Sequence, residues 1–161
     1  MNSIKLLSAL ILLIFSGSTM IAQSINAPEH EKKEILNVIE KLFDGMREGD
    51  SSKVASVFDK EVSMLTSYTN KEGKKIISKG DLSRFLTAIG TPHEKVWDEK
   101  IWNTQIMIDG GIAQVWTDYA FYVGTDFSHC GVDAFHLVRR GESGWKIVHL
   151  MDTRKKEGCK E

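Results

Sequence analysis

The spacing of apolar residues changes once along this chain, from a helical repeat to an alternating one. Between residues 29 and 48 apolar side chains recur every three or four positions, which predicts one amphipathic helix ended by Gly49. Asp50 can then cap a second, short helix over residues 51–58. The apolar stripe of the first helix consists of Ile35, Leu36, Ile39, Leu42, Phe43 and Met46.

The middle of the chain carries weaker signals of the same kinds. Residues 62–68 alternate between apolar and polar well enough for a strand, and residues 76–77 predict another short one. Asp81 can cap a third helix, which Gly90 ends. We therefore expect two minor strands between the second and third helices.

From Trp97 onward the period is close to two, which predicts long strands joined by tight turns at residues 109–111 and 141–144. An antiparallel meander that follows helices favours an α+β domain, in which a curved antiparallel sheet wraps around the N-terminal helices and encloses a pocket. The four strands are expected at residues 97–108, 112–124, 128–140 and 144–152.

Residues 1–22 differ in kind from the rest of the chain. They hold one charge, Lys5, followed by a run of ten residues that is apolar except for Ser8. This pattern is typical of an export signal cleaved after Ala22, and the run is too short to cross a bilayer. We expect a periplasmic or secreted protein without a membrane anchor, with one domain over residues 23–154 and a mobile tail at 155–161.

Composition narrows the partners and the compartment. A chain of 161 residues with a formal net charge of -1 offers no electrostatic reason to bind nucleic acid or a membrane surface. Export would place Cys130 and Cys159 where a disulfide is permitted. The alternative is a buried free Cys130 and an unpaired Cys159 in the tail.

Three segments carry a resemblance to a known family: GDSSKVASVF after the first helix, and CGVDAFHLVR and GWKIVHLMDTR in the last two strands. In this order of elements the chain resembles the nuclear transport factor 2-like superfamily, also called SnoaL-like, and within it small exported bacterial proteins grouped as lumazine-binding. The resemblance implies a cone-shaped cavity and a homodimer formed through the sheet. It transfers no activity, because the superfamily includes isomerases, dehydratases, cyclases and plain binding modules.

The candidate chemistry depends on the register of the last two strands. If Arg139 lies opposite Trp145, Asp133 lies diagonally next to His149 on one face, and a carboxylate would hold an imidazole ready for proton transfer. If Arg140 takes that place instead, Asp133 faces another carboxylate, Asp152. We prefer the first register, although Asp133 and His149 could also satisfy each other as a purely structural pair.

Aromatic and polar side chains near this pair would line a binding pocket. Glu99 is either a solvated edge carboxylate or a second acid in the pocket, and we favour the former. No cofactor is predicted and no metal site, because Cys130 points away from His129 and Asp133 in a regular strand. Three functions stay open: a binder of a small apolar or heterocyclic molecule, an isomerase- or dehydratase-like proton-transfer enzyme, and a dimeric structural module. The predicted lining residues are Tyr119, Phe121, Tyr122, His129, Phe135 and Arg154.

Overall fold

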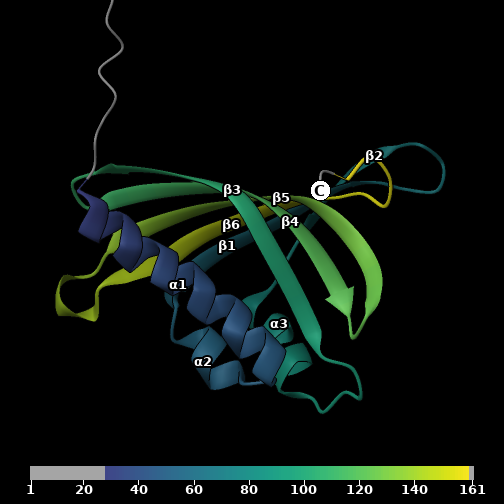
Figure 1. Cartoon of the computed structure of the whole chain (residues 1–161), viewed down its shortest axis with the longest axis horizontal. Coiled ribbons are helices and arrows are strands. Elements are labelled where there is room, and N and C mark those ends of the chain that lie inside the picture. The colour runs from purple at the N-terminus through teal and green to yellow at the C-terminus, as the bar shows by residue number, and fades with distance from the viewer. Residues whose placement is uncertain (1–27, 160–161) are drawn as a thin grey trace, which may run out of the picture.

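A curved, unclosed sheet of six strands arches over three helices in the computed structural model, which describes residues 28–159 (Figure 1). The helices are α1 (Glu29–Glu48), α2 (Ser51–Ala55) and α3 (Leu82–Gly90). The strands are β1 (Phe58–Thr69), β2 (Lys75–Lys79), β3 (Trp97–Asp109), β4 (Ile112–Val123), β5 (Asp126–Arg139) and β6 (Trp145–Arg154), with a short 3-10 turn, η1 (Gly141–Ser143), before β6. The predicted α+β class is confirmed. The predicted export signal lies outside the described residues.

The helices begin and end largely where their capping residues predict. Gly49 adopts a left-handed φ of 68° at the end of α1, and the Asp81 side chain accepts a hydrogen bond from the Arg84 amide at the start of α3. The second helix is shorter than predicted, because the chain leaves it after Ala55 and Phe58 already pairs with β6. Sheet pairing and burial of Phe58 therefore override the helical spacing. Among residues 28–159, no helix combines the length and apolar character needed to cross a bilayer.

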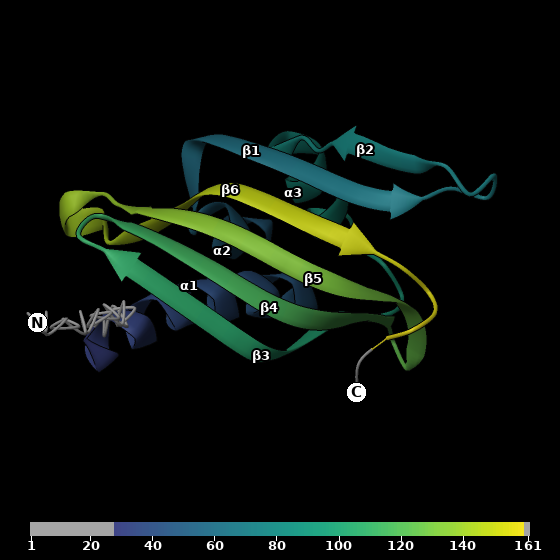
Figure 2. The ribbon, with the colours of Figure 1, turned by 90° about the horizontal axis from the view of Figure 1, so that it is seen from above.

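The strands lie in the order β2-β1-β6-β5-β4-β3, with the predicted meander of β3 to β6 confirmed (Figure 2). Four of the five strand pairings are antiparallel as expected, but β1 joins the sheet parallel to β6. The backbone amide of Ile147 donates to the Val57 carbonyl at 2.9 Å, which starts this parallel pairing directly after α2. The first and last strands of the chain thus meet in the middle of the sheet.

A β-bulge near the middle of β6 changes the register of the last hairpin. Arg139 lies opposite Trp145, as predicted, and Leu137 lies opposite Ile147. Val148 is then an extra residue on β6, so that His136 faces His149 and Asp133 faces Asp152. Next to the turn, the preferred register is confirmed. Beyond the bulge, the strands follow the register that we rejected.

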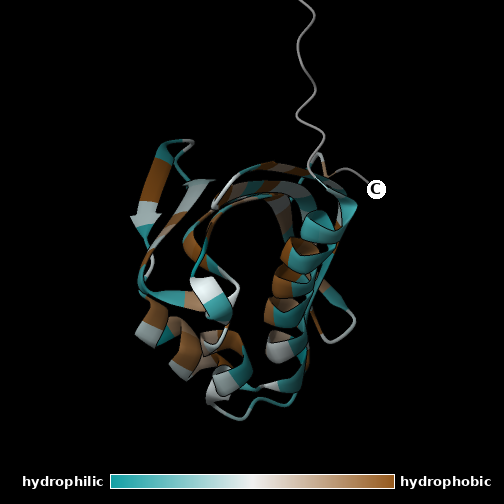
Figure 3. Ribbon diagram, turned by 90° about the vertical axis from the view of Figure 1, so that its left-hand side faces the viewer, coloured by the Kyte–Doolittle hydropathy of each residue, from teal (hydrophilic) through white to brown (hydrophobic). Residues whose placement is uncertain are grey.

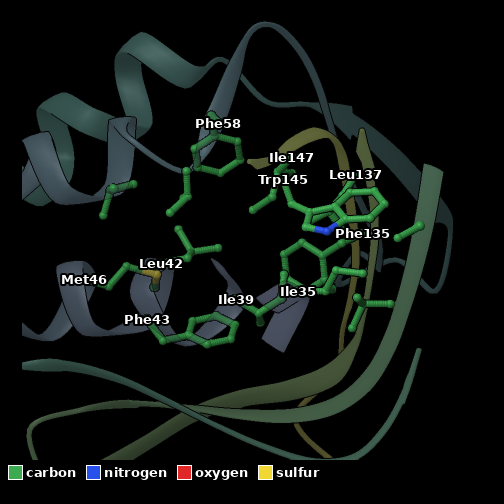
Figure 4. Packing of buried hydrophobic residues seen from close by; sticks show 14 of the residues in the cluster. Ile35, Ile39, Leu42, Phe43, Met46, Phe58, Phe135, Leu137, Trp145 and Ile147 are labelled. Carbon is green, nitrogen blue, oxygen red and sulfur yellow. The ribbon is translucent and has the colours of Figure 1, made fainter. Parts of the chain in front are cut away.

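The concave face of the sheet and the inward face of α1 form the hydrophobic core (Figures 3 and 4). Phe43 of α1 packs edge-on against Phe135 of β5, with ring centroids 6.4 Å apart. Ile39 and Ile147 are fully buried in the same cluster, and each buried side chain of this size contributes about 2 kcal/mol. The core therefore fills the part of the hollow nearest the helices.

The C-terminal segment is attached to the sheet. Lys155 exchanges two backbone hydrogen bonds of 2.9 Å with Cys130, and a disulfide joins Cys130 to Cys159. The expected mobile tail is thus tied to β5 as far as Cys159. The predicted alternative of two unpaired cysteines is not what the structure contains.

Candidate functional site

Polar side chains replace the hydrophobic core at the end of the concave face where β6 runs into the C-terminal segment. Each comes from a different place in the sheet, and strand pairing sets them side by side: Asp133 lies opposite Asp152, and Asp152 lies beside Thr66. We call this set the concave polar cluster. Its members are Thr66, Glu99, Tyr119, Asp133, Asp152 and Arg154.

Asp152 is the hub of the concave polar cluster. One carboxylate oxygen accepts a hydrogen bond of 2.6 Å from the Thr66 hydroxyl, and the other accepts one of 2.6 Å from Nε of Arg154. The Tyr119 hydroxyl lies 3.5 Å from the second oxygen and donates at 2.9 Å to the Thr153 carbonyl. Charge-assisted bonds of this kind hold Arg154 in a fixed position at the edge of the cluster.

Glu99 and Asp133 form a carboxyl pair next to this hub. Burial, and then the charge of Glu99, raise the pKa of Asp133 well above its usual value. Burial likewise raises the pKa of Glu99 to about 7, although its hydrogen bond with Asp133 opposes that rise. Oδ2 of Asp133 is buried and receives no hydrogen bond from a donor within residues 28–159. Asp133 is buried and Glu99 is partly buried, and two neighbouring carboxylates in such surroundings repel each other unless one is protonated. The raised pKa values therefore favour a proton shared by the pair near neutral pH.

The shared proton predicts a pH dependence of stability. Unfolded carboxyl groups have pKa values near 4, whereas the folded Glu99 has a pKa of about 7. The folded state therefore gains stability that is complete below about pH 4 and is lost as the pH rises through about 7. We expect the double variant Glu99→Gln/Asp133→Asn to gain on the order of 2 kcal/mol relative to wild type between pH 5 and 8.

Urea unfolding of both proteins across this pH range measures the effect. His129 acts in the opposite direction in both proteins, because burial, and then Arg154, lower its pKa to about 4. The informative quantity is therefore the difference between the two curves. Parallel curves would show that Glu99 and Asp133 share no proton.

Aromatic rings continue the concave face on the far side of the carboxyl pair. The Trp97 ring stacks on His93 at 4.6 Å and meets the edge of Phe121, whose ring lies 5.1 Å from that of His129. Tyr119 then lies 5.7 Å from His129, nearly perpendicular to it. With its lowered pKa, His129 is a neutral imidazole at pH 7. This side of the site is a continuous aromatic wall with few charges.

An open cleft of about 910 Å³ lies where the aromatic wall, the β1–β2 hairpin and the C-terminal segment meet. His129 and Arg154 line it, so the cleft adjoins the concave polar cluster. Four cationic side chains and one carboxylate are among its lining residues: Lys71, Arg154, Lys155, Lys156 and Glu157. Thr66, Tyr68, Ser78 and Ser128 add hydroxyl groups. The mouth of the site is thus positively charged, in contrast to the carboxyl groups deeper in the sheet.

The structure brings together only some of the predicted site residues. Tyr119, Phe121, His129, Asp133 and Arg154 share the concave face. Phe135 shares it too, but it is fully buried in the hydrophobic core.

Two predicted residues lie on the convex face. His149 faces His136 there because the bulge at Val148 shifts β6 by one position, so the predicted Asp133–His149 pair does not form. Tyr122 points away from Phe121 and packs against Phe127, with Lys100 over its ring. Neither side chain can line the cleft.

The prediction that Glu99 is a solvated edge carboxylate is wrong, because Glu99 is the second acid beside Asp133, and two tail residues at the cleft were missed. Glu99 alternates with Trp97 and Ile101 on the same face of β3, and this placement among apolar residues was the available signal that it points inward. Lys155 and Lys156 belong to the predicted mobile tail, and the disulfide of Cys159 together with the backbone bonds between Lys155 and Cys130 brings them to the cleft. No local pattern in the tail marks that contact.

A family model described as "Putative lumazine-binding" matches residues 30–151, which is most of the chain. The chain belongs to this family. The match spans α1 to β6 and so includes every element that contributes to the aromatic wall and the carboxyl pair. No curated protein is similar to this chain at a significant level.

Solved structures share the fold of this lumazine-binding family domain. An NTF2-like protein of unknown function from Shewanella baltica is 18% identical, with a TM-score of 0.60, over 82% of this chain and 100% of that one. A "putative dehydratase from the NTF2-like family" of Streptomyces avermitilis is 14% identical, with a TM-score of 0.60, over 81% and 99%. A protein of cystatin-like fold from Nostoc punctiforme is 12% identical, with a TM-score of 0.63, over 81% and 95%. At these identities the likeness establishes the nuclear transport factor 2-like fold, and family and fold together indicate a ligand-binding domain in general.

Proposed function

We propose that this protein binds a small organic anion with an aromatic or heterocyclic ring in the cleft beside the concave polar cluster. The observation that carries the proposal is a cleft of about 910 Å³ in which four cationic side chains lie together with the rings of Tyr68 and His129. That volume is within the range of small-molecule sites, which combine apolar walls with a few well-placed polar groups. The ring would lie against His129 and Tyr68, and the anionic group would meet Arg154.

The charge distribution supports an anion rather than a cation. Arg154 is held by Asp152 through Nε alone, and its side chain is 51% exposed. The guanidinium can therefore still donate from its terminal nitrogens to a carboxylate, phosphate or sulfonate. Lys156 lies at the same mouth and adds to the positive potential. The buried carboxyl groups of Glu99 and Asp133 repel an anion less once they share a proton.

Binding of the fluorescent anion anilinonaphthalene sulfonate tests this proposal. Arg154→Gln should weaken the affinity by about tenfold, since a hydrogen bond to a charged group contributes about 1.5–3 kcal/mol. Lys156→Gln should shift the affinity in the same direction by less. Lys41→Gln, which removes the same charge from the exposed side of α1, is the matched control. Equal affinities in all four proteins would refute the cleft as the binding site. If the cleft is the binding site, native mass spectrometry of protein purified from its own cells should identify the natural ligand by its mass.

Proton transfer is a second candidate function, favoured by the Glu99–Asp133 pair. A carboxyl group with a pKa of about 7 can both donate and accept a proton at neutral pH. This pair would replace the predicted Asp133–His149 pair in the same role. Glu99→Gln should then abolish the turnover of any substrate that is found, while anilinonaphthalene sulfonate still binds.

We also propose that the protein is exported and works as a homodimer. A disulfide between Cys130 and Cys159 fits an oxidising compartment, and amino-terminal sequencing of the cell-derived protein should begin at Gln23.

The convex face carries exposed apolar side chains, among them Met107 at 56% and Trp116 at 44%. Analytical ultracentrifugation at micromolar concentration should show a dimer, and a monomer would count against pairing through this face.

A further inference from the structure

His136 and His149 form a pair of imidazoles on the convex face, away from the cleft. They lie directly opposite each other on β5 and β6, with ring centroids 5.4 Å apart and an angle of 25° between the ring planes. The His136 side chain is exposed and that of His149 is half-buried. In one copy of the chain both rings are therefore within reach of a ligand from solvent, and they share the convex face through which the proposed dimer would pair.

The bulge at Val148 is what creates this pair. In the register that holds at the turn, His136 would lie opposite Val148, and His149 would point to the other face. The extra residue turns His149 outward and sets it across from His136. Bulges often re-aim a side chain at a functional position, at the cost of regular ladder bonds.

The surroundings of His149 favour its neutral form. Burial, and then the charge of His136, lower the pKa of His149. On the same row of the convex face, Gln114 lies beside His136 and Ser63 lies beside His149. The nearest cation along β6 is Lys146, whose ammonium group is held by the Ser56 carbonyl at 2.6 Å.

We propose that His136 and His149 chelate a divalent transition-metal ion through both imidazoles, with water in the remaining coordination positions. Neutral imidazole suits Cu²⁺, Ni²⁺ and Zn²⁺, and Cu²⁺ binds most tightly in this series. An imidazole nitrogen coordinates through a lone pair in the plane of its ring, so the two rings must turn out of their near-parallel stack to share a metal. Side chains directly opposite on adjacent strands, with ring centroids 5.4 Å apart, lie close enough for one nitrogen of each ring to reach a shared ion at 2.0–2.1 Å after that turn. Residues 28–159 hold no cluster of three or more histidine, cysteine, aspartate or glutamate residues suited to a metal, so two protein ligands define the site.

Titration of the tag-free mature protein with Cu²⁺ at pH 7.5 tests the proposal. Calorimetry gives the affinity, and electron paramagnetic resonance should show coupling of the bound copper to imidazole nitrogens. In known metal sites, loss of a residue that only hydrogen-bonds to a ligand weakens the metal affinity by about 10–100-fold. His136→Gln and His149→Gln each remove a ligand itself, so each should weaken copper binding by at least that much. Binding should also fall at pH 5.5, where imidazoles become protonated.

The matched control is His93→Gln, because His93 stacks on Trp97 at the opposite face and should not contribute. Both variant positions are on the surface, and circular dichroism of each variant checks that the fold is intact. The proposal is overturned if copper binds His136→Gln and His149→Gln as tightly as wild type, or if only one of the two variants loses affinity. The first outcome would place the copper elsewhere, and the second would show a single imidazole instead of a chelate.

Discussion

Gly131→Ala should destabilise the protein by roughly 3 kcal/mol, at the upper end of the range for overpacked sites. A Cβ atom at Gly131 would lie 1.8 Å from the Thr153 carbonyl oxygen and 2.7 Å from its carbon, and both are backbone atoms that cannot rotate away. That carbonyl also accepts the Tyr119 hydroxyl at 2.9 Å. Separating β5 from β6 to make room would therefore break this bond and disturb the concave polar cluster as well.

Urea unfolding compares this variant with a matched control, Gly111→Ala. Nothing lies within 4 Å of a Cβ atom at Gly111, so its effect should stay within about 0.5 kcal/mol. Near-ultraviolet circular dichroism should change only for Gly131→Ala, because Tyr119 loses its fixed environment there. Equal stability of the two variants would mean that the strands at Gly131 are not in close contact.

Cys159→Ser should lower the free energy of unfolding by about 2–4 kcal/mol, the usual range for a native disulfide. The bridge closes a loop between residues 29 positions apart and restricts the unfolded chain. It also holds Lys155 and Lys156 at the cleft, so the variant should bind anilinonaphthalene sulfonate more weakly. Both effects arise from one covalent bond.

A reducing agent provides the internal control for this variant. Reduced wild type should unfold at the same urea concentration as Cys159→Ser, and the reagent should leave Cys159→Ser unchanged. Cys130 is only 2% exposed, so its free thiol in the variant should not form bridges between molecules. If reduction leaves the wild-type midpoint where it was, the bridge does not stabilise the fold.

The fold was predictable from the sequence because its signals are local. The apolar stripe of α1 and the Asp81 cap of α3 each act within a few residues of where they stand. The alternation from β3 to β6 marks four strands without any knowledge of their partners. Parallel pairing of β1 with β6 was missed, because it depends on contacts between distant parts of the chain.

The candidate site was less predictable, because it depends on register and on one bulge. Valine is common in regular strands, so nothing about Val148 in the sequence marks it as a bulge. The bulge nevertheless decides that Asp133 lies opposite Asp152 and not next to His149. The inward direction of Glu99 could be seen from its apolar neighbours on β3. Its pairing with Asp133 could not, since β4 lies between the two strands and sets the distance across the sheet.

The parallel contact between β1 and β6 also bears on when the protein can fold. Until β6 has been synthesised, β1 lacks the neighbour that would cover its inner edge, and the sheet stays split into the β1–β2 hairpin and the meander of β3 to β5. Contacts between segments so far apart in the chain form late, because a large loop must close first. The nascent polypeptide should therefore not complete its fold before β6 emerges, which would suit the export proposed above.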